Sequence, residues 1–269
     1  MRRNAPTGFF DSGVGGLAVR DAFIARAPSE STIYLADTAN CPYGNKPPEE
    51  IVALSVRNTE FLLSLGCKAV VVACNTATAA AIDSLRAKWP KIPFIGMEPA
   101  IKPAALQSKS GKIGVLATAG TFDGRLYRET KRKYASGVVV LAAVADELVG
   151  IAESLAKTSG GIFRMAREDE LEGAAKERAE AAVRRVVEPL VAAGADRIVL
   201  GCTHFLHLKK TIAAAAKGLA EVVDPAEAVA RHAAATLARA GLSDQSGGAP
   251  SHRLFSNQKR KGLAEYGQE

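Results

Sequence analysis

The segments KAVVVACNTA (residues 68–77) and DRIVLGCTHF (residues 196–205) are two versions of one pattern. Each begins with a charged residue, continues through a mostly aliphatic run, and reaches a small residue, a cysteine and two polar residues. Such a run, followed by a new helical pattern, predicts a buried strand with a cysteine at its carboxyl end. Cys74 and Cys202 thus mark two similar α/β units, although a chance likeness between common βα units stays open at this point.

Strand-like runs recur around these two segments, with helical sequence between them. The further strands are expected at 32–37, 93–97, 112–118 and 137–145, and the helices at 49–65, 75–89, 121–134, 147–156, 168–194 and 224–241. This alternation predicts an α/β fold class, with parallel sheets covered by helices on both sides. The repeated pattern suggests two similar α/β lobes that face each other. Ligands in such sheets bind beyond the carboxyl ends of the strands.

Size and composition narrow the class of protein. The chain has 269 residues, 48% of them hydrophobic, which is enough for a sizeable core. No apolar run reaches the ~18 residues of a membrane helix, and the start MRRNAPTGFF lacks the apolar stretch of a secretory signal. We therefore expect a cytoplasmic protein without membrane contact. The net charge is +7, but the basic runs at 131–133 and 258–262 are short and lack interleaved aromatic residues. They favour a solvated surface over a nucleic-acid site.

A glycine-rich turn follows the first predicted strand, in FFDSGVGGLAV (residues 9–19). The spacing G-x-G-x-x-A within it matches a loose dinucleotide-binding fingerprint, and Asp37 lies about where that fingerprint places its ribose-binding acid. Asp11 argues against nucleotide binding, since a carboxylate at the strand end would repel a pyrophosphate. We interpret the glycines as holding the backbone close to a small substrate, with Asp11 and Ser12 facing it.

Cys74 and Cys202 each occupy a place that favours a thiolate. The N–H groups and the dipole at the start of the following helix stabilise an anion. A modest lowering of the pKa from its ordinary value of about 8.5 would make either thiol a general base near neutral pH. A buried, inert thiol is the alternative for one such cysteine. Two in equivalent places, each followed by polar residues, favour a function.

Two opposed thiols suit a racemase. Racemisation removes a proton from one face of a carbon and returns one to the other face, so it needs an acid/base group on each side. A hydrolase would use a single cysteine with a histidine of its own and would leave the second thiol idle. No CxxC pair occurs among the four cysteines, so no metal cluster is expected.

Six motifs between residue 9 and about residue 208 carry a resemblance to a known family. They are DSGVGGL (11–17), ADTANCPYG (36–44), ACNTATA (73–79), MEPAIKPA (97–104), IGVLATAGTF (113–122) and LGCTHF (200–205). On these motifs the chain resembles the glutamate racemases of the cofactor-independent aspartate/glutamate racemase superfamily. The resemblance implies interconversion of L- and D-glutamate without a cofactor, supply of D-glutamate to peptidoglycan, and a homodimer as in many members.

The resemblance also implies a role for each site residue. Cys74 would act on the D-enantiomer, assisted by Asp11, and Cys202 on the L-enantiomer, assisted by His204. Hydroxyls, amides and backbone N–H groups suit the substrate's carboxylates. The residues expected to hold the substrate are Asp11, Ser12, Tyr43, Gly44, Asn75, Thr76, Thr203 and His204.

Some positions depart from the family pattern or fall outside it. Leu206 stands where the family usually has proline, and Glu153 is the best match to an acidic residue that follows a Cys-Pro segment in many members. His207 is either a neighbour of the site or an ordinary helix residue, and we favour the second interpretation. Cys41 lies in a loop near the site with no base assigned to it, and Cys67 is expected to pack in the core.

The resemblance further implies two α/β domains around a central cleft. The first would comprise residues 1–98 and 209–269, and the second residues 99–208. A racemase of another substrate, such as aspartate or a hydantoin, is one alternative function. A non-catalytic protein with a small-anion pocket is another, which the two intact thiols disfavour.

Overall fold

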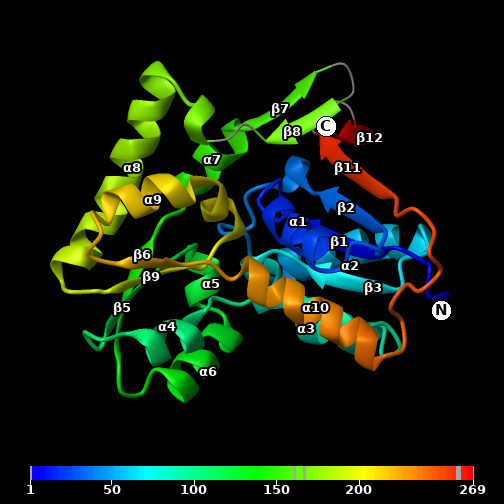
Figure 1. The fold of residues 1–269 in the computed structure, drawn as a ribbon, viewed down its shortest axis with the longest axis horizontal. Coiled ribbons are helices and arrows are strands. Elements are labelled where there is room, and N and C mark those ends of the chain that lie inside the picture. The colour runs from blue at the N-terminus through cyan, green and yellow to red at the C-terminus, as the bar shows by residue number, and fades with distance from the viewer. Residues whose placement is uncertain (1, 160–161, 166–167, 259–261, 269) are drawn as a thin grey trace.

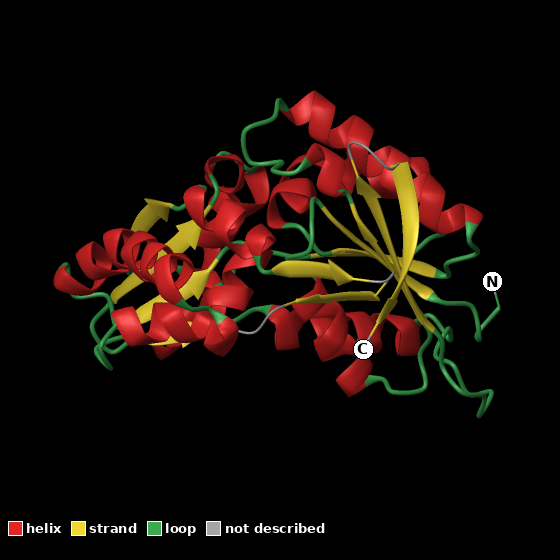
Figure 2. Ribbon diagram, turned by 90° about the horizontal axis from the view of Figure 1, so that it is seen from above, coloured by secondary structure: helices red, strands yellow, loops and turns green. Residues whose placement is uncertain are grey.

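The computed structural model describes residues 2–159, 162–165, 168–258 and 262–268. The strands of these residues form two sheets (Figure 1), and Figure 2 shows them as separate groups of strands with helices around each. We call the parts built on the larger and the smaller sheet the first and the second lobe. This architecture confirms the predicted α/β fold class.

The larger sheet has the strand order β4-β3-β1-β2-β11-β12-β8-β7. Neighbours from β4 to β11 are parallel, β11–β12 and β8–β7 are antiparallel, and β12 runs parallel to β8. β1, β2 and β3 are buried along their whole length, as their apolar sequences require. The strands are β1 Thr7–Asp11, β2 Thr32–Ala36, β3 Ala69–Val72, β4 Phe94–Gly96, β7 Ala156–Ser159, β8 Ile162–Met165, β11 His252–Gln258 and β12 Gly262–Gln268.

The smaller sheet has the order β10-β9-β5-β6, and all its neighbours are parallel. Its strands are β5 Lys112–Ala117, β6 Val139–Val144, β9 Arg197–Leu200 and β10 Glu221–Val223. The α-helices are α1 Leu17–Arg26, α2 Pro48–Ser64, α3 Asn75–Lys88, α4 Ile101–Gln107, α5 Ala119–Phe122, α6 Arg125–Tyr134, α7 Glu147–Ser154, α8 Gly173–Ala192, α9 Lys209–Ala215 and α10 Ala226–Arg239. The 3-10 helices are η1 Thr38–Asn40, η2 Glu168–Glu170 and η3 Thr203–Leu208. No helix in the described part of the chain is both long and apolar enough to cross a bilayer.

Strand pairing differs from the predicted domain borders in two places. β10 pairs with β9, so the chain up to Val223 goes with the second lobe, whereas the sequence placed the border at residue 209. The β7–β8 pair follows α7 in the second lobe but joins the first sheet through β12. The single helix predicted at 121–134 is two helices, α5 and α6, separated at Gly124.

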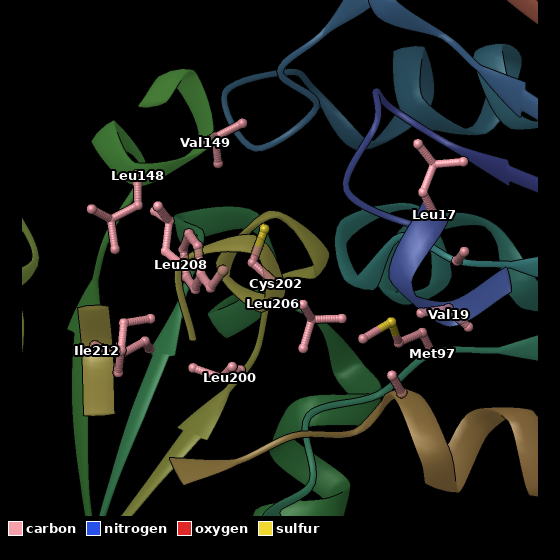
Figure 3. Packing of buried hydrophobic residues seen from close by; sticks show 14 of the residues in the cluster. Leu17, Val19, Met97, Leu148, Val149, Leu200, Cys202, Leu206, Leu208 and Ile212 are labelled. Carbon is pink, nitrogen blue, oxygen red and sulfur yellow. The ribbon is translucent and has the colours of Figure 1, made fainter. Parts of the chain in front are cut away.

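One hydrophobic cluster runs from the first lobe into the second. Figure 3 shows Leu17 and Met97 on one side and Cys202 and Leu206 on the other. Leu206 replaces the proline that the family pattern predicts, and it is 8% exposed in this cluster. The continuous apolar packing therefore fixes Cys202 and the start of η3 relative to the first lobe.

A buried ion pair at the start of β3 gives a prediction for stability. Lys68 Nζ lies 2.6 Å from Glu30 Oε2, and neither side chain is more than 3% exposed. Glu30 Oε1 also accepts from the backbone N–H of Asp244. Lys68→Met leaves an unpaired buried carboxylate, so it should lower the free energy of unfolding by about 3–5 kcal/mol in chemical denaturation.

The surface pair of Lys88 and Glu60 provides a matched control. Its atoms are 2.7 Å apart, but both side chains are about half exposed. Lys88→Met should therefore cost less than ~1 kcal/mol. Equal decreases in the free energy of unfolding for both variants would mean that burial does not determine how much the Lys68–Glu30 pair contributes to stability.

Candidate active site

Cys74 and Cys202 lie just beyond the carboxyl ends of β3 and β9, as predicted. Cys74 is the N-cap of α3, and its Sγ accepts a hydrogen bond from the Ala77 N–H at 3.4 Å. Cys202 precedes η3, so a 3-10 helix stands where the sequence suggested an α-helix. The two side chains are 5% and 7% exposed. Each lobe thus contributes one buried thiol at a strand end.

Asp11 connects the two lobes by hydrogen bonds. Its carboxylate accepts from the N–H groups of Ser12 and Gly16, at 2.6 and 2.5 Å. The Thr203 hydroxyl, on the opposite lobe, donates to Asp11 at 2.9 Å. Burial raises the pKa of Asp11 above its ordinary value. The Ser12 and Gly16 N–H groups of the glycine turn therefore surround a buried acid, and close approach of this backbone to a substrate stays a prediction.

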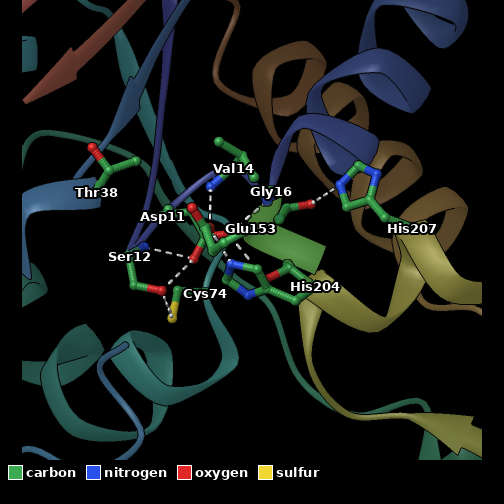
Figure 4. A network of polar contacts seen from close by, with 12 residues as sticks. Asp11, Ser12, Val14, Gly16, Thr38, Cys74, Glu153, His204 and His207 are labelled. Carbon is green, nitrogen blue, oxygen red and sulfur yellow. Dashed lines mark hydrogen bonds and ion pairs between the residues drawn. The ribbon is translucent and has the colours of Figure 1, made fainter. Parts of the chain in front are cut away.

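Ser12 links Cys74 to Asp11 (Figure 4). The Cys74 thiol donates to Ser12 Oγ at 3.9 Å, and Ser12 Oγ is 3.3 Å from Asp11 Oδ1. Burial, with the Asp11 charge second, raises the pKa of Cys74 well above its ordinary value, and the Cys202 charge adds to this rise. The sequence-based expectation of a lowered pKa was wrong for this cysteine, because desolvation and a nearby acid outweigh the helix N-terminus.

His204 stands between Cys202 and Glu153. Its Nδ1 is 3.7 Å from Cys202 Sγ, and its Nε2 is 2.5 Å from Glu153 Oε1. Burial alone would lower the pKa of His204, but contacts with Cys202, Cys41 and Glu153 raise it well above its usual range. Burial would likewise raise the pKa of Glu153, yet the hydrogen bond to His204 holds it below its ordinary value. Both pKa shifts favour an imidazolium beside a carboxylate.

Glu153 also reaches the glycine turn of the other lobe. Its Oε1 accepts from the Val14 N–H at 2.9 Å. A Cβ added to Gly13 would lie 1.9 Å from the same oxygen. Gly13 is thus required for close approach of the carboxylate.

Gly13→Ala should for this reason impair function more than folding. The added methyl group displaces the end of a flexible side chain, which costs little stability, but it moves Glu153 away from His204. We expect activity to fall by about 10²-fold, as for a displacement of ~1 Å in a reacting geometry, and thermal stability to change little. Gly150→Ala, on the same helix as Glu153 and with nothing within 4 Å of the added atom, is the control. If both variants keep full activity, Glu153 has no positioning role.

The predicted substrate-holding residues differ in whether their polar side-chain atoms already have protein partners. Asn75 is buried, and among the described residues neither its Nδ2 nor its Oδ1 has a hydrogen-bond partner, so its amide is available for a ligand. Thr76 Oγ1 lies 2.9 Å from Thr118 Oγ1 on the second lobe. The Tyr43 hydroxyl donates to Asp37. Tyr43 and Asp37 therefore bind each other, and Asp37 is engaged here rather than free for a ribose.

A cavity of about 570 Å³ opens next to Thr76. One side is formed by residues 44–51 and α3 of the first lobe, and the other by residues 119–125 of the second lobe. It reaches Gly44 and Thr76, two of the predicted substrate residues. A Cβ on Gly44 would lie 3.0 Å from the Thr118 side chain, so glycine allows this close approach of the lobes.

Two side chains have partners that the sequence did not suggest. Cys41 Sγ lies within 4.8 Å of a His204 ring nitrogen, although no base was expected near it. His207 Nε2 is 3.1 Å from the Gly15 carbonyl oxygen, so His207 borders the glycine turn and is more than an ordinary helix residue. Neither contact has a local sequence signal, because each joins segments more than 150 residues apart. Cys67 packs in the first-lobe core, as expected.

The fold and these side chains define a two-lobed α/β protein with paired thiols and an acid/base network in one buried site. The chain belongs to the Asp/Glu/hydantoin racemase family, whose model matches residues 18–233. It is 45% identical over 240 residues to the glutamate racemase of Herpetosiphon aurantiacus, covering 89% of this chain and 87% of the relative.

Solved structures agree with this assignment. Glutamate racemase isoform RacE1 from Bacillus anthracis superposes with a TM-score of 0.79 at 30% identity, over 96% of this chain and 90% of that one. Escherichia coli glutamate racemase, solved in complex with L-glutamate and the activator UDP-MurNAc-ala, gives a TM-score of 0.78 at 30% identity, over 94% and 90% of the two chains.

Proposed function

We propose that this protein is a glutamate racemase that interconverts L- and D-glutamate with Cys74 and Cys202 as its two acid/base groups. The observation that carries the proposal is the pairing of two buried thiols, one from each lobe, with Ser12–Asp11 beside one and His204–Glu153 beside the other. The glutamate racemases that resemble this chain over most of its length support the choice of substrate.

In the L-to-D direction, Cys202 takes the α-proton and Cys74 supplies a proton to the opposite face. A donor N–H on Nδ1 of the His204 imidazolium stabilises negative charge on the Cys202 sulfur. The raised pKa of Cys74 keeps that group a protonated thiol, which is the form an acid needs. In the reverse direction the two cysteines exchange roles.

Substrate binding also bears on the protonation of Cys74. The α-ammonium of glutamate would bring a positive charge beside Asp11 and offset the charge that disfavours a Cys74 thiolate. The amide of Asn75, for which the described part of the chain provides no hydrogen-bond partner, would bind a substrate carboxylate or ammonium together with the hydroxyls of Ser12, Thr76 and Thr203. Closure of the lobes around the ligand would exclude water from the carbanion.

The remaining parts of the proposal concern the cell and the assembly. The reaction would run without a cofactor in the cytoplasm and supply D-glutamate for peptidoglycan. Residues 1–98 and 224–269 would act as the first domain and residues 99–223 as the second, after the correction for β10. A homodimer remains a prediction that sedimentation would test.

The proposed function is tested by circular dichroism of L-glutamate, L-aspartate and a hydantoin, without added cofactor, in protium and deuterium oxide. L-Glutamate should lose its optical activity and take up deuterium at the α-carbon, and pyridoxal phosphate should add nothing. Conversion of aspartate or the hydantoin alone would place the protein with another substrate of the same family. No conversion of any of them would favour a non-catalytic anion-binding protein.

A further inference from the structure

A group of three potential metal ligands lies on one side of the site. Cys41 Sγ, a carboxylate oxygen of Glu153 and a ring nitrogen of His204 are all within 4.8 Å of one another. Cys41 and Glu153 are half-buried and His204 is buried, so the group is mostly enclosed but still partly open to solvent. Cys41 follows η1 in the first lobe, whereas the other two residues belong to α7 and η3 in the second lobe. The group is therefore assembled only when the lobes are together.

We propose that Cys41, Glu153 and His204 bind a Zn²⁺ ion across the two lobes, and that the zinc-bound protein is inactive. Thiolate sulfur, imidazole nitrogen and carboxylate oxygen are the ligands that zinc takes in proteins, at about 2.0–2.3 Å. Tetrahedral coordination at those lengths sets the ligand atoms roughly 3–4 Å apart. To reach these separations, Cys41 Sγ must move slightly closer to the other two ligand atoms. The His204 nitrogen and the Glu153 oxygen must move slightly apart. Three protein ligands leave the fourth position to water or a carboxylate.

A zinc ion bound to Cys41, Glu153 and His204 would block racemisation directly, because two of its ligands are needed for proton transfer. Zinc binding would release one proton from the His204 imidazolium and one from the Cys41 thiol to solvent. The ion would then occupy a His204 ring nitrogen and a Glu153 oxygen, and neither group would support proton transfer at Cys202. This part of the inference rests on the proposed function, whereas binding of zinc does not. The sequence offers no metal motif, because 111 positions separate Cys41 from Glu153 (153 − 41 − 1) and a further 50 separate Glu153 from His204 (204 − 153 − 1).

Binding is tested first, with metal ions alone. Zn²⁺ titrated calorimetrically into the metal-free protein should bind once per chain, and Co²⁺ in its place should give a near-ultraviolet thiolate-to-metal absorption band. A Cys74→Ser/Cys202→Ser double variant should keep that band, which Cys41→Ser should lose. Cys41→Ser should also weaken zinc binding by at least about tenfold, the smaller effect seen when even an outer partner of a metal ligand is removed. The control Cys67→Ala should behave as the unchanged protein.

Inhibition is tested separately, in the racemisation assay. Zn²⁺ should inhibit the unchanged protein and Cys67→Ala alike, chelation should restore activity, and Cys41→Ser should need at least about tenfold more zinc for the same inhibition. A Co²⁺ thiolate band that survives in Cys41→Ser and disappears in the double variant would overturn the site, because the metal would then lie between the other two thiols. Binding through Cys41 without inhibition would overturn only the inactive state. Since the cobalt band needs no turnover, failure of the site is distinguishable from failure of the proposed function.

Discussion

Cys74→Ala and Cys202→Ala should each abolish racemisation, with kcat lower by about 10³-fold or more, within the range for loss of a positioned acid or base. The reason is geometric: a proton must leave one face of the α-carbon and arrive at the other, so one remaining thiol cannot complete the reaction. Glutamate binding should partly survive, since the amide and hydroxyl groups around the site are unchanged. The measurements are loss of circular dichroism for turnover and calorimetry for binding.

Deuterium exchange adds a result that a general loss of structure would not give. Cys202→Ala keeps the base proposed to act on D-glutamate, so any α-deuterium uptake should be confined to that enantiomer. Cys74→Ala should show the opposite preference. Cys67→Ala, which removes a thiol from the first-lobe core, should keep its activity. Near-normal racemisation by either single variant would contradict the two-base assignment.

His204→Asn is expected to have the second-largest effect, a decrease of roughly 10²–10³-fold in kcat/KM. The substitution removes the imidazolium that contacts the Cys202 sulfur and leaves Glu153 without its partner. Because the equilibrium constant between enantiomers is 1, kcat/KM must fall equally in both directions. Rates alone therefore cannot show which thiol has been impaired.

An isotope effect identifies the impaired step. With α-deuterated L-glutamate, Cys202 removes the deuteron in the step that His204 supports, so the isotope effect on kcat/KM should rise in His204→Asn. With α-deuterated D-glutamate, Cys74 removes the deuteron, and the effect should not rise. His252→Asn, at the far end of β2 beside Thr32, is the control and should match the unchanged protein. An equal rise with both enantiomers would contradict a specific pairing of His204 with Cys202.

The local sequence was sufficient to predict the features that depend on residues close together in the chain. The aliphatic runs before Cys74 and Cys202 could only be buried strands in an α/β fold, and the parallel arrangement then required both thiols at carboxyl ends. The glycines after Asp11 indicated a backbone that closely approaches a small substrate, which stays a prediction, and the structure adds that the Ser12 and Gly16 N–H groups of this turn donate to Asp11. These features depend on residues within about ten positions of one another.

The remaining features of the fold and the site depend on contacts between segments that are far apart in the sequence. β10 is only three residues long, too short for a strand pattern in the sequence, and it forms because β9 provides an edge to pair with. The raised pKa of Cys74 arises from burial by the whole fold and from Asp11, 63 positions earlier (74 − 11). The proximity of Cys41 to His204 exists only because two lobes meet. Resemblance to a family supplied Glu153 as a candidate, but only the fold gave it His204 and Val14 as partners.

The central claim is that sulfur atoms from two lobes stand on opposite sides of one substrate carbon. A crystal structure of the protein with glutamate bound tests it most directly. We predict that Cys74 Sγ and Cys202 Sγ each lie about 3–3.5 Å from the α-carbon, on opposite faces, as a near-attack geometry requires. A complex in which both sulfurs approach the same face, or in which one points away from the bound glutamate, would contradict the account.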